Sequence, residues 1–296
     1  MIGSTISHYR ITGKIGEGGM GVVYLAEDTR LDRAVALKFL QADSMDESRR
    51  HRFLQEAQAA ARVHHPNICP IYEIDEEAGR IFFVMAYVEG ETIADLVQRY
   101  RVLPFDFALD LAIQVAAGLD AAHRQGIVHR DITSSNIITD KQGHACILDF
   151  GVALREGSER ITETGGAVGT PAYMSPEQAQ GLELDRRSDI WSLGVVLFEM
   201  LAGRLPFRGG TQFNVLYAIV KDNVPDVATL RPDVPAALEH ALRKALAKDP
   251  EKRWQTAAEF AAELRRIRES LSQDTVTLLA TPCLLYTSAR RSCAYS

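Results

Sequence analysis

The chain has 296 residues, of which 46% are hydrophobic and 24% are charged, as is ordinary for a soluble globular protein. This length suits one two-lobed unit or two modest domains. A net charge of −6 argues against a nucleic-acid-binding protein, which usually carries a basic excess. We see no signal peptide and no apolar run of about 18 residues, so we expect no membrane span in this chain. The cysteines show no CxxC spacing, so we expect them to be free thiols.

The first part of the chain is rich in predicted strands. Residues 9–15, 22–27 and 34–40 are short, contain β-branched or aromatic side chains, and are separated by turn residues. Residues 45–63 follow as a predicted helix. Two more strands are expected at residues 68–74 and 80–86, around a turn at residues 75–79.

Helical patterns dominate from about residue 91. Apolar residues repeat every four positions from Phe107 to Leu119, which predicts a long buried helix at residues 105–125, closed by Gly126. Residues 137–139 and 145–148 flank a polar turn and should form a small hairpin.

Three later helices are also predicted. Residues 188–201 are almost wholly apolar and should form a helix in the middle of a helical domain. Residues 236–247 form the next helix, and the pattern from Thr256 to Glu259 is a capping box that opens the last one.

The tail, residues 269–296, differs from the rest. It has no clear period, and we expect it to be disordered. From about residue 283 the sequence matches an adaptor sequence translated in frame, so we interpret this end as non-native; a native disordered tail is the alternative.

A glycine-rich segment at residues 16–23, GEGGMGVV, fits the pattern G-x-G-x-x-G-x-V. Dinucleotide-binding folds share the glycine spacing, but there a helix follows the glycines directly. Here a predicted strand follows. A strand–glycine–strand flap can lay its backbone close to phosphates, whereas a plain hairpin turn is the simpler alternative.

Five charged or polar positions complete a phosphoryl-transfer pattern. Lys38 lies in an apolar strand, and Glu56, 18 residues later on the following helix, can pair with it. Such a pair holds the lysine against the α- and β-phosphates of a nucleotide.

Residues 129–136, HRDITSSN, fit H-R-D-x-x-x-x-N, so Asp131 is the predicted base and Asn136 a metal ligand. Asp149 opens Asp-Phe-Gly and is the predicted principal magnesium ligand.

With residues 169–177, GTPAYMSPE, the chain resembles the eukaryotic-like serine/threonine protein kinases, most closely those of bacteria, from about residue 9 to 268. The resemblance implies an α+β bilobal fold, with a β-rich N-lobe at residues 1–87 and a helical C-lobe at residues 88–268. It implies transfer of the γ-phosphoryl group of ATP to serine or threonine of protein substrates, with Mg²⁺ as cofactor and Mn²⁺ as an alternative. Thr170 disfavours tyrosine specificity.

The resemblance assigns roles to particular positions. Val23 should cover the adenine ring, Met85 should be the gatekeeper, and residues 86–88 should be the hinge. The full set expected at the ATP site is Ile15, Gly16, Glu17, Gly18, Gly19, Met20, Gly21, Val22, Val23, Ala36, Lys38, Met85, Ala86 and Val88. The catalytic set is Lys38, Glu56, Arg130, Asp131, Thr133, Asn136 and Asp149, with Asn136 and Asp149 as metal ligands.

Further residues are assigned to the activation segment and its supports. Gly169, Thr170 and Tyr173 should contact substrate, Glu177 should pair with Arg253, and Asp189 should brace the catalytic loop. Thr162 and Thr164 are the predicted activating phosphorylation sites. Without an anion beside it Arg130 would be an unpaired cation, and a phosphothreonine can supply that anion. A second kinase molecule could phosphorylate both threonines in trans.

One departure leaves a second function open. The family usually has lysine two residues after the catalytic aspartate, and this chain has Thr133. A pseudokinase that binds nucleotide without transfer is therefore the alternative, and a small-molecule phosphotransferase is a third. We expect a cytoplasmic catalytic domain, which related kinases often attach to a membrane anchor.

Overall fold

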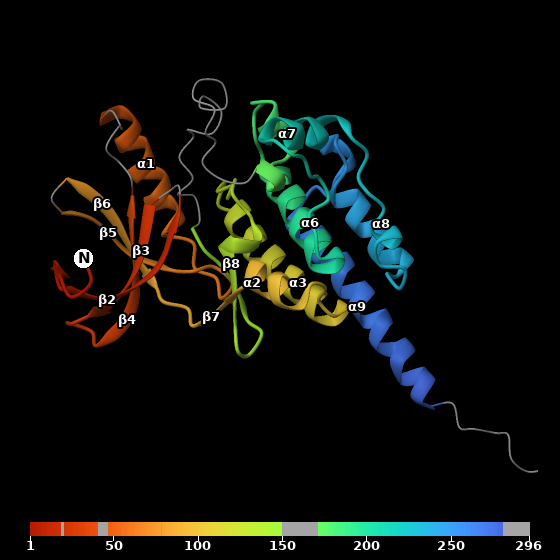
Figure 1. The fold of residues 1–296 in the computed structure, drawn as a ribbon, viewed down its shortest axis with the longest axis horizontal. Helices are drawn as coiled ribbons and strands as arrows, with labels where there is room; N and C mark the ends of the chain where they lie inside the picture. Colours follow the sequence, from red (N-terminus) through yellow and green to blue (C-terminus); the bar gives the residue numbers. More distant parts are fainter. Residues whose placement is uncertain (19–20, 41–46, 78, 150–170, 281–296) are drawn as a thin grey trace, which may run out of the picture.

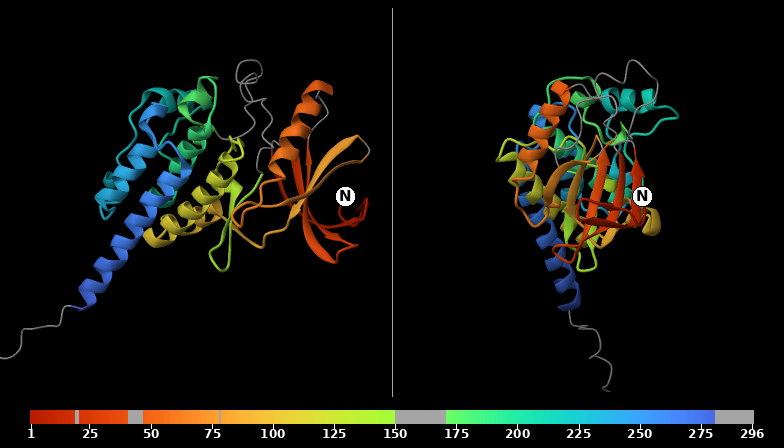
Figure 2. Two further views of the ribbon diagram at one scale, coloured as in Figure 1. Left: turned by 180° about the vertical axis from the view of Figure 1, so that it is seen from behind. Right: turned by 90° about the vertical axis from the view of Figure 1, so that its left-hand side faces the viewer.

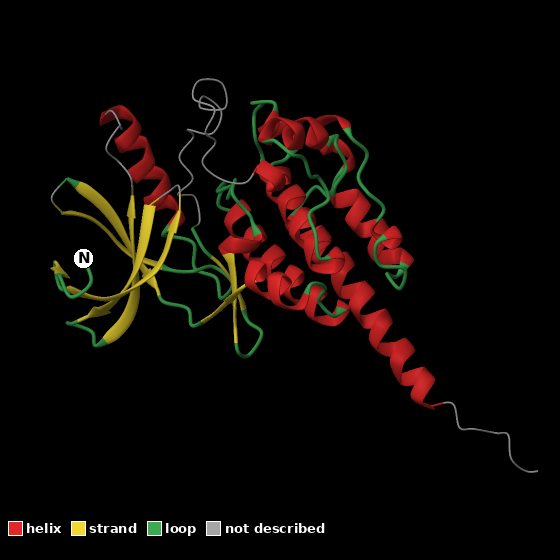
Figure 3. Ribbon diagram, in the orientation of Figure 1, coloured by secondary structure: helices red, strands yellow, loops and turns green. Residues whose placement is uncertain are grey.

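The computed structural model describes residues 1–18, 21–40, 47–77, 79–149 and 171–280. Strands gather at one end of the molecule and helices at the other (Figure 3). This separation matches the α+β class predicted from the sequence.

The N-terminal part is an antiparallel six-stranded sheet with one helix beside it (Figure 1). The sheet order is β1-β2-β3-β4-β6-β5. The strands are β1 (Thr5–Ile6), β2 (Tyr9–Gly18), β3 (Gly21–Asp28), β4 (Arg33–Leu40), β5 (Ile71–Glu77) and β6 (Arg80–Ala86). The helix α1 (Glu47–Ala60) connects β4 to β5 and is shorter than predicted; residues 41–46 lie outside the described part.

The predicted strand at residues 68–74 begins later and ends later than expected. Glu77 pairs with Arg80 across the hairpin, so β5 includes three residues that we assigned to the turn. Because β5 is an edge strand, its acidic side chains face solvent at little cost.

The C-terminal part is helical, with a small three-stranded sheet between it and the large sheet (Figure 1). The small sheet consists of β7 (Gly90–Thr92), β8 (Ile137–Asp140) and β9 (Ala145–Ile147). The α-helices are α2 (Ile93–Tyr100), α3 (Phe105–His123), α5 (Pro176–Ala179), α6 (Arg186–Ala202), α7 (Gln212–Lys221), α8 (Ala236–Ala245) and α9 (Ala257–Ala280). Short 3-10 helices are η1 (Ser134–Asn136), η2 (Pro171–Tyr173), η3 (Val227–Thr229) and η4 (Pro250–Lys252).

Helix α6 is the centre of the helical core, as its apolar sequence predicted. From Ser188 to Leu201 every residue except Glu199 is buried. The helix ends at Gly203, whose φ is +67°, and a Cβ there would lie 2.6 Å from the Arg101 carbonyl oxygen. Only glycine therefore fits this ending.

Three helices, α2, α7 and the four-residue α5, were absent from our sequence prediction. Helix α2 begins with a complete capping box between Thr92 and Asp95, a signal that the sequence does contain. Helix α7 begins at the N-cap Thr211, but its apolar face is short and two large side chains, Phe213 and Tyr217, are exposed.

Helix α9 differs from expectation at both ends. The Thr256 hydroxyl accepts a hydrogen bond from the Glu259 N–H, but the Glu259 carboxylate accepts from Gln255 rather than Thr256, so the capping box is only half formed. The helix continues to Ala280, so residues 269–280 of the expected disordered tail are helical in this structure. Residues 281–296, including the segment interpreted as non-native, lie outside the described part.

Backbone hydrogen bonds join the two parts where they meet. The Cys69 N–H donates to the Ile147 carbonyl, and the Ile147 N–H donates to the Asn67 carbonyl, both at 2.9 Å. These bonds fix the segment between α1 and β5 against β9. Figure 2 shows from behind that the large sheet and α1 lie at one end of the molecule and the later helices at the other. None of the helices that the structure describes has the length and apolar character needed to cross a membrane.

Candidate active site

The glycine-rich segment is a hairpin between β2 and β3, as its strand–glycine–strand pattern predicted. Gly18 pairs with Gly21, and Glu17 forms an ion pair with Lys14 at 2.5 Å. Gly21 has a φ of +135°, and a Cβ there would lie 1.8 Å from the Phe39 carbonyl oxygen. A side chain at this position would therefore push the hairpin away from β4. The tip, residues 19–20, lies outside the described part.

The residues predicted to surround adenine lie in one apolar cluster. Ala36 and Met85 are opposite each other on β4 and β6, and both are 6% exposed. Val23, Ala86 and Val88 pack against the same cluster, which also contains Cys69 and Cys146. Ile15 is half-exposed at the edge of the flap. Residues from β3, β4, β6 and the predicted hinge therefore meet in this one cluster.

Lys38 pairs with Asp149 rather than with Glu56. The distance from Lys38 Nζ to Asp149 Oδ2 is 2.8 Å, and Lys38 is only 4% exposed. A buried lysine needs a close anion, and Asp149 supplies one. Glu56 instead lies 3.6 Å from Arg130, so Arg130 also has a partner, contrary to our expectation that it would be unpaired.

Asp131 and Asn136 are held together by hydrogen bonds. Asn136 Nδ2 donates to the Asp131 carbonyl and to Asp131 Oδ2, both at 2.9 Å. The Asp131 N–H donates to His129 Nδ1 at 3.2 Å. These contacts fix the carboxylate of the predicted base before any substrate arrives.

Burial has a chemical effect on Asp131. It raises the pKa of this carboxyl above its usual value, and the nearby negative charge of Asp149 raises it further. His129 and the Asn136 amide oppose this shift without cancelling it. A raised pKa makes the carboxylate a stronger proton acceptor.

Asp189 supports the catalytic loop from α6, as predicted. Its two carboxylate oxygens accept hydrogen bonds at 2.8 Å from the N–H groups of His129 and Arg130. His123 Nε2 lies 2.7 Å from the same carboxylate. Arg130 has a φ of +69°, a strained conformation that these bonds stabilise.

The donors at the metal position suit a hard divalent cation. Asn136 directs its amide nitrogen at Asp131, so its carbonyl oxygen is the atom available to a metal. Asp149 has a φ of +59° and offers carboxylate oxygens. Amide and carboxylate oxygens are the ligands that Mg²⁺ and Mn²⁺ prefer.

Thr133 has a structural role that its sequence position did not reveal. Its hydroxyl accepts a hydrogen bond of 3.2 Å from the Asn136 N–H and thereby caps η1. The side chain that replaces the family's lysine thus helps to position a predicted metal ligand.

Tyr173 connects the activation segment to the catalytic loop. Its hydroxyl lies 2.7 Å from Ser134 Oγ and 2.7 Å from Glu199 Oε2. Sequence reasoning placed Tyr173 at the substrate segment but missed Ser134 and Glu199. No short motif links these three residues, because they come from η2, η1 and α6.

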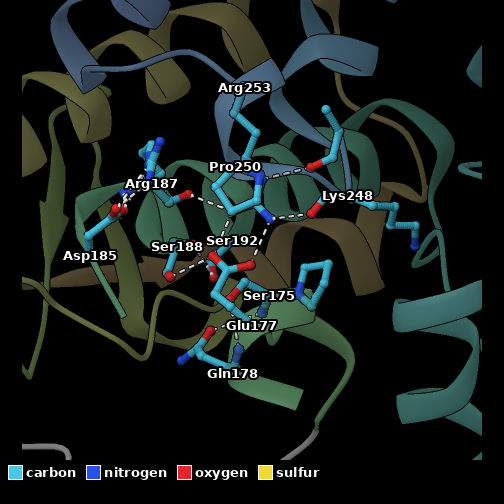
Figure 4. Close-up of polar contacts among 12 residues, drawn as sticks. Ser175, Glu177, Gln178, Asp185, Arg187, Ser188, Ser192, Lys248, Pro250 and Arg253 are labelled. Carbon is cyan, nitrogen blue, oxygen red and sulfur yellow. Dashed lines mark hydrogen bonds and ion pairs between the residues drawn. The ribbon is translucent and has the colours of Figure 1, made fainter. Parts of the chain in front are cut away.

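Glu177 and Arg253 form the predicted ion pair (Figure 4). Arg253 is 1% exposed and donates to Glu177 Oε1 and Oε2 at 2.6 and 2.7 Å. It also donates to the carbonyls of Ala247, Arg187 and Lys248. All five guanidinium N–H groups therefore have acceptors.

Glu177 is stabilised as an anion. Burial alone would raise the pKa of its carboxyl, but the hydrogen bonds and charge of Arg253 and the Ser188 hydroxyl hold that pKa below its usual value. The next residue, Gln178, donates to the Arg130 carbonyl at 2.7 Å, a link to the catalytic loop that the sequence did not reveal. The predicted sites Thr162, Thr164, Gly169 and Thr170 lie outside the described residues.

The chain is similar in sequence to known proteins over most of its length. The model of the protein kinase domain matches residues 9–264. The chain is 41% identical over 267 residues to the serine/threonine-protein kinase PrkC of Bacillus subtilis (strain 168), covering 90% of this chain and 41% of PrkC. It is 38% identical over 294 residues to the serine/threonine-protein kinase PknB of Mycobacterium leprae, covering 97% of this chain and 46% of PknB.

The chain thus spans less than half the length of these relatives. The matched region includes the glycine hairpin, Lys38, the catalytic loop and the Glu177–Arg253 pair. Because the family model covers most of its length, the chain belongs to the protein kinase domain family.

Proposed function

We propose that this chain is an active serine/threonine protein kinase domain that transfers the γ-phosphoryl group of ATP to protein substrates. The observation that carries the proposal is that Lys38 pairs with Asp149, that Asn136 hydrogen-bonds Asp131, and that Asp131 lies within the electrostatic influence of Lys38 and Asp149. A radiolabelled γ-phosphoryl transfer assay with a generic protein acceptor tests it, and the pseudokinase alternative expects no transfer.

The mechanism needs little covalent chemistry from the protein. Phosphoryl transfer depends on in-line positioning and on neutralising the charge of the phosphates. Asp131 accepts the proton of the acceptor hydroxyl, while Lys38 contributes positive charge from β4. We propose Mg²⁺ as the metal held by Asn136 and Asp149, where it would neutralise phosphate charge.

Thr133 supplies the first test. Replacing Thr133 by lysine adds a cation near the transferred group but removes the cap on η1. We expect Thr133→Lys to raise turnover by about threefold, because the added charge acts on the transition state. Thr133→Val, which removes only the cap, should lower turnover by a similar factor, since a lost N-cap costs about 1 kcal/mol.

The measurement is steady-state turnover at saturating ATP, with Thr133→Ser as the control that keeps the hydroxyl. Transfer that is absent in the wild type and present only in Thr133→Lys would favour the pseudokinase.

We also propose that phosphorylation of Thr162 and Thr164 activates the domain. Arg130 pairs with Glu56 at 3.6 Å, and both side chains are partly exposed, so this contact is worth only about 0–1 kcal/mol. A phosphothreonine carries about −1.5 to −2 charges and can compete for Arg130. Release of Glu56 would leave it available to Lys38.

The test of this switch combines mass spectrometry and kinetics. Incubation with Mg-ATP should add phosphate at one or both threonines, and none in Asp131→Asn. The double variant Thr162→Ala, Thr164→Ala should lose about tenfold or more of its activity on added substrate, within the usual range of regulatory couplings. Full activity in the double variant would show that the switch is wrong.

We infer three further properties from the family resemblance. The boundary between the two lobes lies at residues 87–88. The domain is cytoplasmic, and a second copy phosphorylates it in trans. Partial proteolysis tests the boundary, and mixing an inactive Asp131→Asn chain with the wild type tests transfer between molecules.

A further inference from the structure

Two buried thiols beside the nucleotide site have no role in the proposed mechanism. Cys69 and Cys146 are both free, and they are 5% and 8% exposed. They belong to the apolar cluster that contains Ala36 and Met85. They come from separate segments, one before β5 and one in β9.

The backbone holds the two thiols near each other. Ile68 and Ile147 form a parallel β-bridge; Cys69 follows the first and Cys146 precedes the second, so the two cysteines lie diagonally across the bridge, on the same face of it. The Cys69 N–H donates to the Ile147 carbonyl at 2.9 Å, which fixes the two segments together. The interaction between the two thiols lowers the pKa of Cys146 and raises that of Cys69.

Each thiol is connected to a different part of the nucleotide site. Cys69 Sγ lies 3.4 Å from the carbonyl oxygen of Ala86, a predicted hinge residue. Cys146 lies three residues before Asp149 on a short segment that also carries Leu148. A covalent bond between the thiols would therefore act on the hinge and on the metal ligand together.

We propose that Cys69 and Cys146 form a reversible disulfide when the protein meets a hydroperoxide, and that this bond weakens nucleotide binding. The nucleotide part rests on the proposed function, whereas formation of the bond does not.

The chemistry balances with hydrogen peroxide as the oxidant. The Cys146 thiolate attacks one peroxide oxygen, breaks the O–O bond and becomes a sulfenic acid; the departing hydroxide takes up a proton and leaves as water. The Cys69 sulfur then attacks the sulfenic sulfur, its proton leaves with the hydroxyl as a second water, and the S–S bond forms. Two thiols are oxidised and one peroxide is reduced to two waters. A dithiol reductant reverses the process by exchange.

The expected effect on binding follows from geometry. A disulfide requires an S–S distance of about 2.05 Å and a fixed dihedral angle. Drawing the sulfurs together removes the Cys69 thiol from the Ala86 carbonyl and pulls on β9, which leads to Asp149. Both changes alter groups that we assign to nucleotide and metal.

The experiment uses the full chain with Cys283→Ser and Cys293→Ser, so that Cys69 and Cys146 are its only thiols. The protein is treated with hydrogen peroxide, digested without reduction, and searched for the peptide that joins Cys69 to Cys146. The dissociation constant for Mg-ADP is measured by calorimetry before oxidation, after oxidation and after reduction. Cys69→Ser and Cys146→Ser in the same background are the matched controls, and each keeps a hydrogen-bonding hydroxyl.

We expect the cross-linked peptide in the parent protein and a rise of about tenfold in its dissociation constant, a typical size for coupling between sites. Reduction should restore the original value, and neither serine variant should respond. Absence of the cross-linked peptide after peroxide, or an unchanged dissociation constant in cross-linked protein, overturns the proposal. If the reduced protein binds no Mg-ADP, the proposed function fails, while the peptide still decides whether the disulfide forms.

Discussion

Replacing Asp131 by asparagine should lower the turnover number by about 10³-fold, within the range for loss of a general base. The substitution is nearly isosteric, and the asparagine oxygen can still accept the hydrogen bond from Asn136 Nδ2. The loop should therefore keep its shape, and the dissociation constant for Mg-ATP should change by less than about twofold, because the base acts on the acceptor hydroxyl.

The comparison with Asp149 makes this test specific. Asp149→Asn should weaken metal-dependent nucleotide binding, and it should also deprive buried Lys38 of its anion. Asp106→Asn, at an exposed position in the first turn of α3, is the matched control with no expected effect. Turnover within about threefold of wild type in Asp131→Asn would contradict the assignment, given the usual effect of losing a base.

The pH dependence gives an independent readout. Because burial and then Asp149 raise the pKa of Asp131, the acid limb of kcat/KM should lie above the ordinary aspartate value of about 3.9. The rate should fall as pH drops through that limb, since the protonated carboxyl cannot accept a proton. The limb should be missing from the residual activity of Asp131→Asn.

Replacing Arg253 by methionine should lower the free energy of unfolding by about 3–5 kcal/mol, the usual effect of removing one partner from a buried ion pair. The substitution leaves Glu177 buried without its cation, and it removes the donors to three backbone carbonyls. Urea denaturation followed by circular dichroism measures the change. Activity should also fall, because Gln178, the residue after Glu177, donates a hydrogen bond to the Arg130 carbonyl in the catalytic loop.

The control for this variant is the same substitution at an exposed arginine that also pairs with a glutamate. Arg266 pairs with Glu263 on α9, and its side chain is 62% exposed. Arg266→Met should cost about 0.2–1 kcal/mol. Equal effects of the two substitutions would show that burial does not determine the strength of the Arg253 contact.

The same pair predicts how the stability difference varies with pH. Glu177 has a lowered pKa in the folded protein, so its contribution is present above the unfolded glutamate value of about 4.3 and is lost as pH falls through the folded value. The difference between wild type and Arg253→Met should therefore shrink in acid and stay constant near neutral pH.

The sequence alone determined the fold class and most helices and strands, and it named the residues that we expect to carry the chemistry. An apolar residue at every fourth position located α3, and an almost wholly apolar run located α6. The phosphoryl-transfer motifs are short and continuous, so Asp131, Asn136 and Asp149 were identifiable one by one. Even the Glu177–Arg253 pair was expected, through the family resemblance.

Only the tertiary structure decided which of these groups touch. Lys38 could pair with Glu56 or Asp149, and Arg130 could be free or paired; sequence spacing cannot separate these outcomes, because the partners come from different elements. The cap that Thr133 forms and the meeting of Cys69 with Cys146 depend on the same long-range packing. Local propensity is encoded in neighbouring residues, whereas the choice among ion-pair and hydrogen-bond partners depends on distances that exist only once β4, α1, the catalytic loop and β9 are packed together.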